Sequence, residues 1–276
     1  MKRNLNMKAL LTSGLLALVA LQAAAQTPAA PVFKSTCEDN GSSNRQNFCE
    51  TRDLTMAAPA AGQTLSIDGR RNGGITIRGW DGTDVRVRAR VQSWGNSSAD
   101  AQAQVKAVQI KSTGNVLKAE AGAGDDNWAV SYEVFVPRKT ALALTTHNGG
   151  ISIEGTQAPI TFEALNGGIA LADLGGDVRG TTTNGGVSVR LTGNKWEGKG
   201  LDVRTTNGGI TWRIPESYSA QLKTETVHGG LSTDYPVTVT GKIGRGLDTK
   251  LGQGGALVSV VTTNGGISLR RATGEN

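Results

Sequence analysis

The chain has 276 residues, including 38 glycines, 7 prolines and 2 cysteines, with only 5 Trp, 3 Tyr and 4 Phe. So much glycine, without a collagen period and with little proline, excludes a triple helix and ordinary disorder and is typical of a turn-rich β protein. The formal net charge of +6 falls to +3 if Lys2, Arg3 and Lys8 are removed with a leader segment. A nearly neutral, exported chain argues against nucleic acid as a partner.

Residues 1–25 are expected to form a signal peptide. A basic stretch from Met1 to Lys8 precedes an apolar stretch from Ala9 to Leu21, and the small residues Ala23 to Ala25 form a cleavage site before Gln26. A membrane anchor needs about 20 apolar residues, and this run is shorter. We therefore expect an exported protein of the periplasm or cell surface, with no transmembrane segment in the mature chain.

Residues 26–62 are expected to form a flexible N-terminal segment. It contains both cysteines, Cys37 and Cys49, and an oxidising compartment favours a disulfide between them. Closing so short a loop stabilises the chain by about 3 kcal/mol in the chain-entropy model. A metal site is not expected, because two cysteines without a nearby histidine or third cysteine cannot complete a tetrahedral shell.

Residues 63–139 are expected to form a mixed antiparallel β cap. The alternation from Val85 to Val91 predicts a half-exposed strand, and the Ala-rich run from Asn96 predicts one short helix. Residues 109–112, 116–120 and 128–136 are predicted to be strands, the last two joined by a Gly-Asp turn. Such a cap would cover the open end of a repeat array, where unpaired backbone invites aggregation.

A repeat dominates residues 140–276. The tripeptide Asn-Gly-Gly followed by Ile or Val occurs six times, with a His-Gly-Gly-Leu variant, at Asn72, Asn148, Asn166, Asn184, Asn207, Asn264 and, for the variant, His228. From Asn148 the spacings are 18, 18, 23 and 21 residues, and the 36 residues from His228 to Asn264 equal two periods of 18. Bulky-small-bulky triplets follow the turns and threonines precede them, which predicts strand, turn, strand, turn in each unit.

Two topologies satisfy this period. An antiparallel meander is favoured by Asn-Gly, the strongest short hairpin signal. A flattened β-solenoid, with one coil per unit of about 18 residues, explains why asparagine recurs in one position, because stacked asparagines can hydrogen-bond as a ladder. We favour the solenoid and expect about seven coils from residues 140–271. The predicted fold class is therefore mainly all-β: a β-solenoid-like stack with a small mixed cap.

Several segments carry a family resemblance. "YEVFVP" from Tyr132, "LALTTHNGGISIEG" from Leu142, the NGGI series and the ending "VTTNGGISL" occur in that order. Over residues 63–271 the chain resembles the bacterial exported β-strand-repeat family labelled putative adhesins. The resemblance implies a β-solenoid-like domain of the cell envelope without established catalytic or binding residues. Where the family turn is commonly Asn-Gly-Asp-Ile, this chain has a second glycine, which makes a metal array along the turns less expected.

Catalytic chemistry is not indicated. The histidines, His147 and His228, fall at repeat turns, and the nucleophile elbow, the zinc-protease motif and the phosphate loop are absent. We expect a non-enzyme without metal or cofactor. A glycan-active β-helix enzyme is the less favoured alternative.

Two surface features are candidate binding elements. Arg86, Arg88 and Arg90 project from one strand face and could bind phosphate or carboxylate groups; the alternative is a solvated face whose charges prevent edge pairing. Trp196, within the 23-residue spacing, could stack on a sugar from a protruding loop; the alternative is local packing over the solenoid.

The functional expectation is a non-catalytic envelope or cell-surface protein, an adhesin that binds through its repetitive β surface. The alternative is a periplasmic envelope-stress or structural protein that contacts wall or lipid components. The expected partners are envelope polysaccharide, anionic lipid or a host or cell-surface component, and not nucleic acid. Ligand identity, oligomeric state and the side of the outer membrane stay open.

Overall fold

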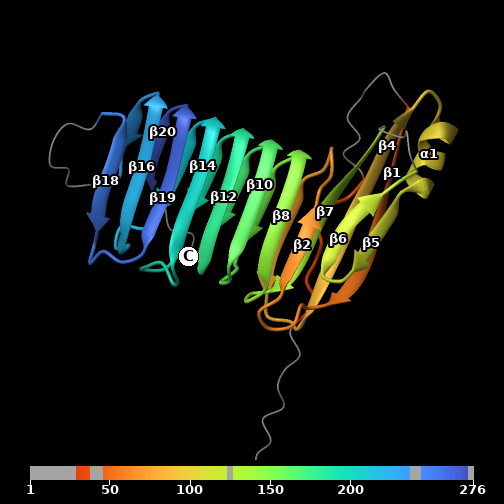
Figure 1. Cartoon of the computed structure of the whole chain (residues 1–276), viewed down its shortest axis with the longest axis horizontal. Helices are drawn as coiled ribbons and strands as arrows, with labels where there is room; N and C mark the ends of the chain where they lie inside the picture. The colour runs from red at the N-terminus through yellow and green to blue at the C-terminus, as the bar shows by residue number, and fades with distance from the viewer. Residues whose placement is uncertain (1–28, 38–45, 123–126, 237–243, 273–276) are drawn as a thin grey trace, which may run out of the picture.

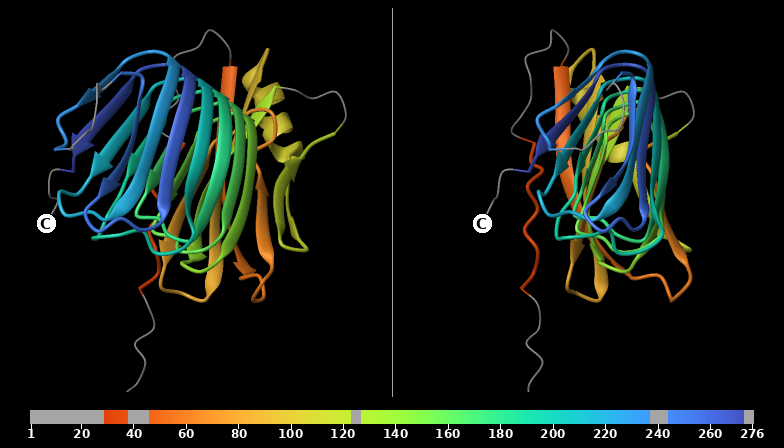
Figure 2. Two further views of the ribbon diagram at one scale, coloured as in Figure 1. Left: turned by 60° about the vertical axis from the view of Figure 1, so that its left-hand side comes forward. Right: turned by 90° about the vertical axis from the view of Figure 1, so that its left-hand side faces the viewer.

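The computed structural model describes residues 29–37, 46–122, 127–236 and 244–272. The expected signal peptide lies outside the described residues, as does most of the expected Gly-Asp turn before residue 127. The described strands form two sheets of ten strands each, which lie face to face as the two layers of an elongated stack (Figures 1 and 2).

We call the two layers sheet A and sheet B. In spatial order, sheet A contains β1 (Gln46–Ala57), β4 (Asp84–Gly95), β7 (Trp128–Pro137), β3 (Ile75–Trp80), β9 (Ile151–Glu154), β11 (Ile169–Ala172), β13 (Val187–Arg190), β15 (Ile210–Ile214), β20 (Ile267–Arg271) and β17 (Leu231–Thr233). Sheet B contains β18 (Gly246–Leu251), β16 (Ala220–His228), β19 (Leu257–Asn264), β14 (Gly200–Asn207), β12 (Asp177–Asn184), β10 (Ile160–Asn166), β8 (Ala141–Asn148), β2 (Thr64–Asp68), β6 (Val116–Glu120) and β5 (Gln109–Thr113).

The repeat units pair in parallel. β10 is parallel to both β8 and β12 in sheet B, and β11 is parallel to both β9 and β13 in sheet A. Each Asn-Gly-Gly turn therefore carries the chain from one sheet to the other and is not a hairpin. Its backbone bonds to the next coil, as when Gly167 N–H donates to the Asn184 carbonyl at 3.0 Å. The solenoid prediction is confirmed, and the antiparallel meander is excluded for the repeats.

The core lies between the two sheets. Alternate residues of each strand point inward, so the bulky members of every bulky-small-bulky triplet are buried, as with Ile151 and Ile153 at 1% and 0% exposure. Burying one such side chain stabilises the fold by about 1.5–3 kcal/mol. Because each coil adds the same few apolar residues to one continuous column, no coil has a core of its own and stability comes from stacking.

The threonines before the turns have a role beyond strand propensity. They point inward, and each hydroxyl donates to the carbonyl of the first turn glycine in a neighbouring coil. The distance is 2.7 Å for Thr146 and 2.8 Å for Thr182, Thr205, Thr226 and Thr262. These bonds satisfy the buried hydroxyl and one turn carbonyl together, so they fix the corner of each coil.

The last coils do not follow chain order. The coil of β19 and β20 lies between the coil of β14 and β15 and the coil of β16 and β17, while β18 pairs antiparallel with β16 at the edge of sheet B. The interpretation of the His228 to Asn264 interval as two coils is therefore wrong. Within the described residues from 140 onward, six coils are formed and not about seven.

The N-terminal end combines parallel and antiparallel strands. β2 and β3 pair in parallel with β8 and β9, and β6 and β7 add a further parallel rung. β1, β4 and β5 then join antiparallel. Helix α1 (Ser98–Ala107) lies at this end beside β1 and β4 (Figure 1). Ser97 caps it by accepting from Asp100 N–H at 3.1 Å, and its buried Val105 packs into the open end of the core.

Candidate functional site

The repeat asparagines form one ladder along an edge of the stack. In each case the side-chain Nδ2 donates to the Oδ1 of the preceding rung, at distances of 2.7–3.0 Å. In spatial order the rungs are Asn72, Asn148, Asn166, Asn184, Asn207 and Asn264, and His228 lies in register beside Asn264. These residues hold coils to one another, so the geometry gives them a structural role.

The outer face of β4 is covered by the N-terminal residues. Backbone N–H groups of Lys34 and Ser35 donate to the carboxylate of Glu133 on β7, at 2.9 and 2.8 Å. The ring of Phe33 packs edge-on against Phe135, with 5.3 Å between centroids. A disulfide joins Cys37 to Cys49 of β1, with Cα atoms 5.6 Å apart. Residues 29–37, the N-terminal strap, thus lie along the outside of sheet A (Figure 2).

The strap contacts two of the three arginines proposed from the sequence, Arg88 and Arg90. Arg88 lies over the Phe33 ring at 4.7 Å and pairs with Asp53 at 2.7 Å. Arg90 donates to the Thr36 carbonyl at 2.8 Å. Arg86 stacks on Trp80 at 4.9 Å and pairs with Asp84 at 3.3 Å. All three point outward from one strand as expected, but they bind parts of the same chain and do not present an open basic stripe.

Glu133 is the anchor of the strap. Its side chain is nearly buried and also forms an ion pair with Arg78. Burial by itself would raise its pKa, but the N–H groups of Ser35 and Lys34 and the Arg78 guanidinium favour the charged form more, and its pKa is lowered. Arg88 likewise lowers the pKa of Asp53 by hydrogen bonding. The outer face of β4 and β7 is therefore a closed ionic network at neutral pH.

Trp196 does not protrude. It is only 5% exposed, belongs to the core, and donates from Nε1 to the Gly176 carbonyl at 3.0 Å. The insertion that contains it folds back over the flank of the solenoid, so the interpretation of Trp196 as a sugar platform is wrong and the packing alternative is the observed one.

The two histidines are far apart. His147 lies on β8 and His228 on β16, five strand steps along sheet B, a separation of about 24 Å at the usual strand spacing. Among the described residues, no group of three or more His, Cys, Asp or Glu side chains could hold a metal ion. The two histidines therefore do not belong to one site.

Three arginines form an array across neighbouring strands of sheet A, in the part of the stack built by the C-terminal half of the chain. Arg190, Arg213 and Arg270 are paired in register on the adjacent parallel strands β13, β15 and β20. Arg190 forms an ion pair with Glu154 at 2.8 Å, and Arg270 donates to Ser268 at 3.1 Å. Arg213 is exposed and, within the described part of the chain, forms no ion pair. This Arg array is an outward basic surface that the strap does not engage.

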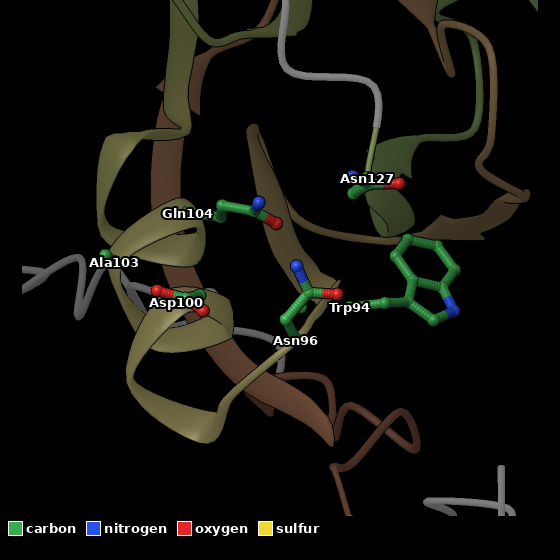
Figure 3. Close-up of a pocket in the computed structure, with 7 residues that line it drawn as sticks. Trp94, Asn96, Asp100, Ala103, Gln104 and Asn127 are labelled. Atoms are coloured by element: carbon green, nitrogen blue, oxygen red, sulfur yellow. The ribbon is translucent and has the colours of Figure 1, made fainter. Parts of the chain in front are cut away.

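Adjacent hollows open at the other end of sheet A, around Trp94. One of about 460 Å³ is lined by Trp94, Asn72, Asn127 and Asn148 over a floor of small residues. A second, of about 420 Å³, lies between Trp94 and helix α1 and is lined by Asn96, Asp100 and Gln104 (Figure 3). A polar aromatic cleft of this kind is a ligand-sized feature.

The sequence over most of this fold matches one family model, described as Toastrack DUF4097, across residues 61–270. The chain belongs to the Toastrack DUF4097 family. The resemblance drawn from the repeat motifs is thereby confirmed, and the Toastrack match includes the asparagine ladder and the Arg array. No curated protein matches the chain.

Three solved structures are similar to this chain. A putative cell adhesion protein from Clostridium sporogenes is 11% identical, with a TM-score of 0.46, over 80% of this chain and 100% of that one. A putative adhesin from Bacteroides fragilis is 12% identical, with a TM-score of 0.40, over 81% and 97%. A putative lipid binding protein from Parabacteroides distasonis is 10% identical, with a TM-score of 0.33, over 82% and 97%. Similarities of this size define no ligand or site in this chain.

The Arg array and the Trp94 hollows are the features that reasoning from the sequence missed. For the array a signal was present: Arg follows the bulky-small-bulky triplet at 190, 213 and 270, the same place in three repeats. The hollows had no such signal, because their residues come from the first repeat turn, β4, β7, β8 and α1.

Among the residues that the structure describes, no helix combines the length and the apolar character needed to span a membrane.

Proposed function

We propose that this protein is a non-catalytic, exported binding protein of the cell envelope that attaches to phosphate-bearing surfaces through the outer face of sheet A. The Arg array is the observation that carries the proposal. The proposal still assigns adhesion to a repetitive β surface. The arginines that make the contact are now Arg190, Arg213 and Arg270, in place of Arg86, Arg88 and Arg90.

The charges of the array are poorly compensated within the protein. Parallel pairing holds the three arginines on neighbouring strands, about 4.8 Å apart at the backbone. Two like charges about 5 Å apart repel by about 0.8 kcal/mol in water. Only Arg190 has a carboxylate partner among the described residues. A stack of exposed guanidinium groups costs stability in the free protein, and bound anions would remove that cost.

The shape of the surface suits an extended or flat ligand. Next to the arginines runs a column of small outward residues, Ser188, Thr211 and Ser268, also in register. The outer face therefore carries a column of arginines beside a column of hydroxyl side chains. Arginine binds phosphate with two parallel hydrogen bonds, so a row of them matches phosphate groups repeated along a polymer or across a lipid surface.

The test uses the mature protein and two phosphate sources: vesicles of phosphatidylcholine with phosphatidylglycerol, and soluble poly(glycerol phosphate). The variant changes Arg213→Ser together with Arg270→Ser. The matched control changes Arg179→Ser together with Arg204→Ser, two exposed arginines on the outer face of sheet B whose partners are Asp177 and Asp202. Both variants lose the same net charge.

We expect the sheet A variant to bind roughly 30-fold more weakly, because each basic residue at an anionic surface contributes about 1 kcal/mol, and the control to bind within a few-fold of the unchanged protein. Binding to vesicles alone would assign a lipid headgroup, and binding to the polymer alone would assign a wall polymer. Equal losses in the two variants, or no loss in either, would exclude the array as the contact.

A further inference from the structure

Trp94 stands apart from the other aromatic residues of the fold. It follows Ser93 on β4, whose inward positions are all buried, so its own side chain points to the outside of sheet A. Trp128, opposite Ser93 on β7, packs against the core, and Trp80 is covered by Arg86. Trp94 is half-exposed and is not among the residues that pack against the core. Its indole is therefore available beside the two hollows.

The floor of the larger hollow has almost no side chains. Gly73 and Gly74 of the first repeat turn lie beside Ala129 and Ser131 of β7. Ser131 accepts a hydrogen bond from Gly74 N–H at 3.3 Å, which closes the floor. A built Cβ on Gly73 would lie within 2.8 Å of the Gly69 carbonyl oxygen and still closer to Val130. The backbone approach that forces glycine at this position also keeps the hollow open.

The walls carry uncharged amides. Asn72, Asn127 and Asn148 line the larger hollow, which contains no charged side chain. Each asparagine of the ladder donates from Nδ2 to Oδ1 of the preceding asparagine. Asn72 is the first asparagine of the ladder, so no ladder oxygen accepts a hydrogen bond from its Nδ2. Across the smaller hollow, Asn96 and Gln104 are drawn with their amides toward the same space, and Asp100 adds one carboxylate (Figure 3).

The walls are also held in place. Trp94 N–H donates to the Asn127 carbonyl at 3.0 Å, which ties the ends of β4 and β7 together. With its amide oriented to donate, Gln104 bonds the carbonyls of Trp94 and Asn127 at 3.2 and 3.3 Å. Helix α1 is thereby fixed to both strands. A site whose supporting groups are already bonded loses little entropy when a ligand binds.

We propose that the two hollows around Trp94 form a binding site for a neutral oligosaccharide. One sugar face would stack on the indole, and the hydroxyls would exchange hydrogen bonds with amides that both donate and accept. Hollows of about 460 and 420 Å³ that both include Trp94 in their lining accommodate adjoining sugar units. The nearly uncharged lining favours neutral sugars over the anions that the Arg array would bind.

This site is independent of the Arg array. Trp94 on β4 and Arg213 on β15, the middle of the array, are six strand steps apart in sheet A, or about 29 Å across the sheet. Loss of phosphate binding at the Arg array does not predict loss of sugar binding at Trp94, so each proposal can be refuted without the other.

The experiment is a titration of the mature protein with tetrasaccharides of N-acetylglucosamine, cellulose and starch type, followed by calorimetry. We compare Trp94→Ala, Trp94→Phe and, as a control outside the site, Arg213→Ser. We expect at least one sugar to bind, with affinity reduced about tenfold or more in Trp94→Ala. Trp94→Phe should retain affinity within a few-fold, and Arg213→Ser should be unchanged.

Thermal unfolding of the same variants checks the fold, because Trp94 lies outside the core and its removal should leave Tm nearly unchanged. Absence of binding to all three sugars would overturn the proposal. So would binding that Trp94→Ala leaves intact, since the indole would then not be part of the contact.

Discussion

The two glycines of each turn are predicted to differ sharply in whether they can be replaced by a residue with a Cβ atom. A Cβ on Gly167 would lie 2.9 Å from Gly150 N and closer still to the Gly149 carbonyl. A Cβ on Gly168 would meet nothing nearer than the Gly186 carbonyl oxygen at 3.5 Å, an ordinary contact. Gly167→Ala and Gly168→Ala therefore form a matched pair, one residue apart in the same coil.

The cost of Gly167→Ala follows from its surroundings. The clash is with backbone, so the coil must shift, and its hydrogen bonds shift with it: Gly167 N–H to the Asn184 carbonyl at 3.0 Å and Thr182 Oγ1 to the Gly167 carbonyl at 2.8 Å. Overpacking costs about 1–3 kcal/mol, and two weakened hydrogen bonds cost about 1 kcal/mol each. We expect destabilisation of roughly 4 kcal/mol.

The assay is thermal and urea unfolding of the mature protein followed by circular dichroism. For a chain of this size the expected loss corresponds to a Tm lower by about 10 °C, whereas Gly168→Ala should change Tm by no more than about 3 °C. Similar Tm values for the two variants would refute the stacking geometry, because only close approach of consecutive coils distinguishes the two positions.

Three further predictions concern the strap, the core and the Arg array. Because its pKa is lowered in the folded protein, charged Glu133 stabilises the strap above its ordinary pKa of 4.5, and this stabilisation is lost as pH falls below that value. Proteolysis within residues 29–36 should therefore accelerate on acidification, and Glu133→Gln should be cleaved quickly at neutral pH too; a strap equally resistant in both proteins would contradict the anchor. Trp196→Ala should destabilise the fold by about 3–5 kcal/mol in urea unfolding, as for a buried aromatic, and a change under about 1 kcal/mol would contradict its burial. Arg213→Thr should raise the free energy of unfolding by about 0.5–1 kcal/mol at low salt, and a large loss would mean that Arg213 is a structural residue.

The sequence predicted the repeat fold because the decisive information is local. Asparagine recurs in the same position before each turn, and bulky residues alternate after it, which identifies both the corner and the buried face of a coil. The threonine hydroxyls were not foreseen, because their acceptors are carbonyls in neighbouring coils.

The errors arose where the fold depends on distant contacts. Any coil with this turn can stack on any other. The sequence therefore did not show that the coil of β19 and β20 is inserted between the coil of β14 and β15 and the coil of β16 and β17. The arginines of β4 were placed on the correct face, but the partners Ser35 and Thr36 are more than 50 residues away in the chain. Trp196 was placed on a loop tip because spacing reveals an insertion but not the direction in which it folds.

The most direct measurement of the binding face is site-specific photocrosslinking in the producing cells. A photoreactive residue replaces Thr211, on the outer face of sheet A in the column next to the arginines, or Thr181, at an outward position of sheet B. If sheet A is the contact surface, position 211 should crosslink to phosphate-bearing envelope material, position 181 should not, and Arg213→Ser with Arg270→Ser should abolish the product at 211. Crosslinks from position 181 alone, or equal crosslinks from both positions, would show that the protein does not bind through sheet A.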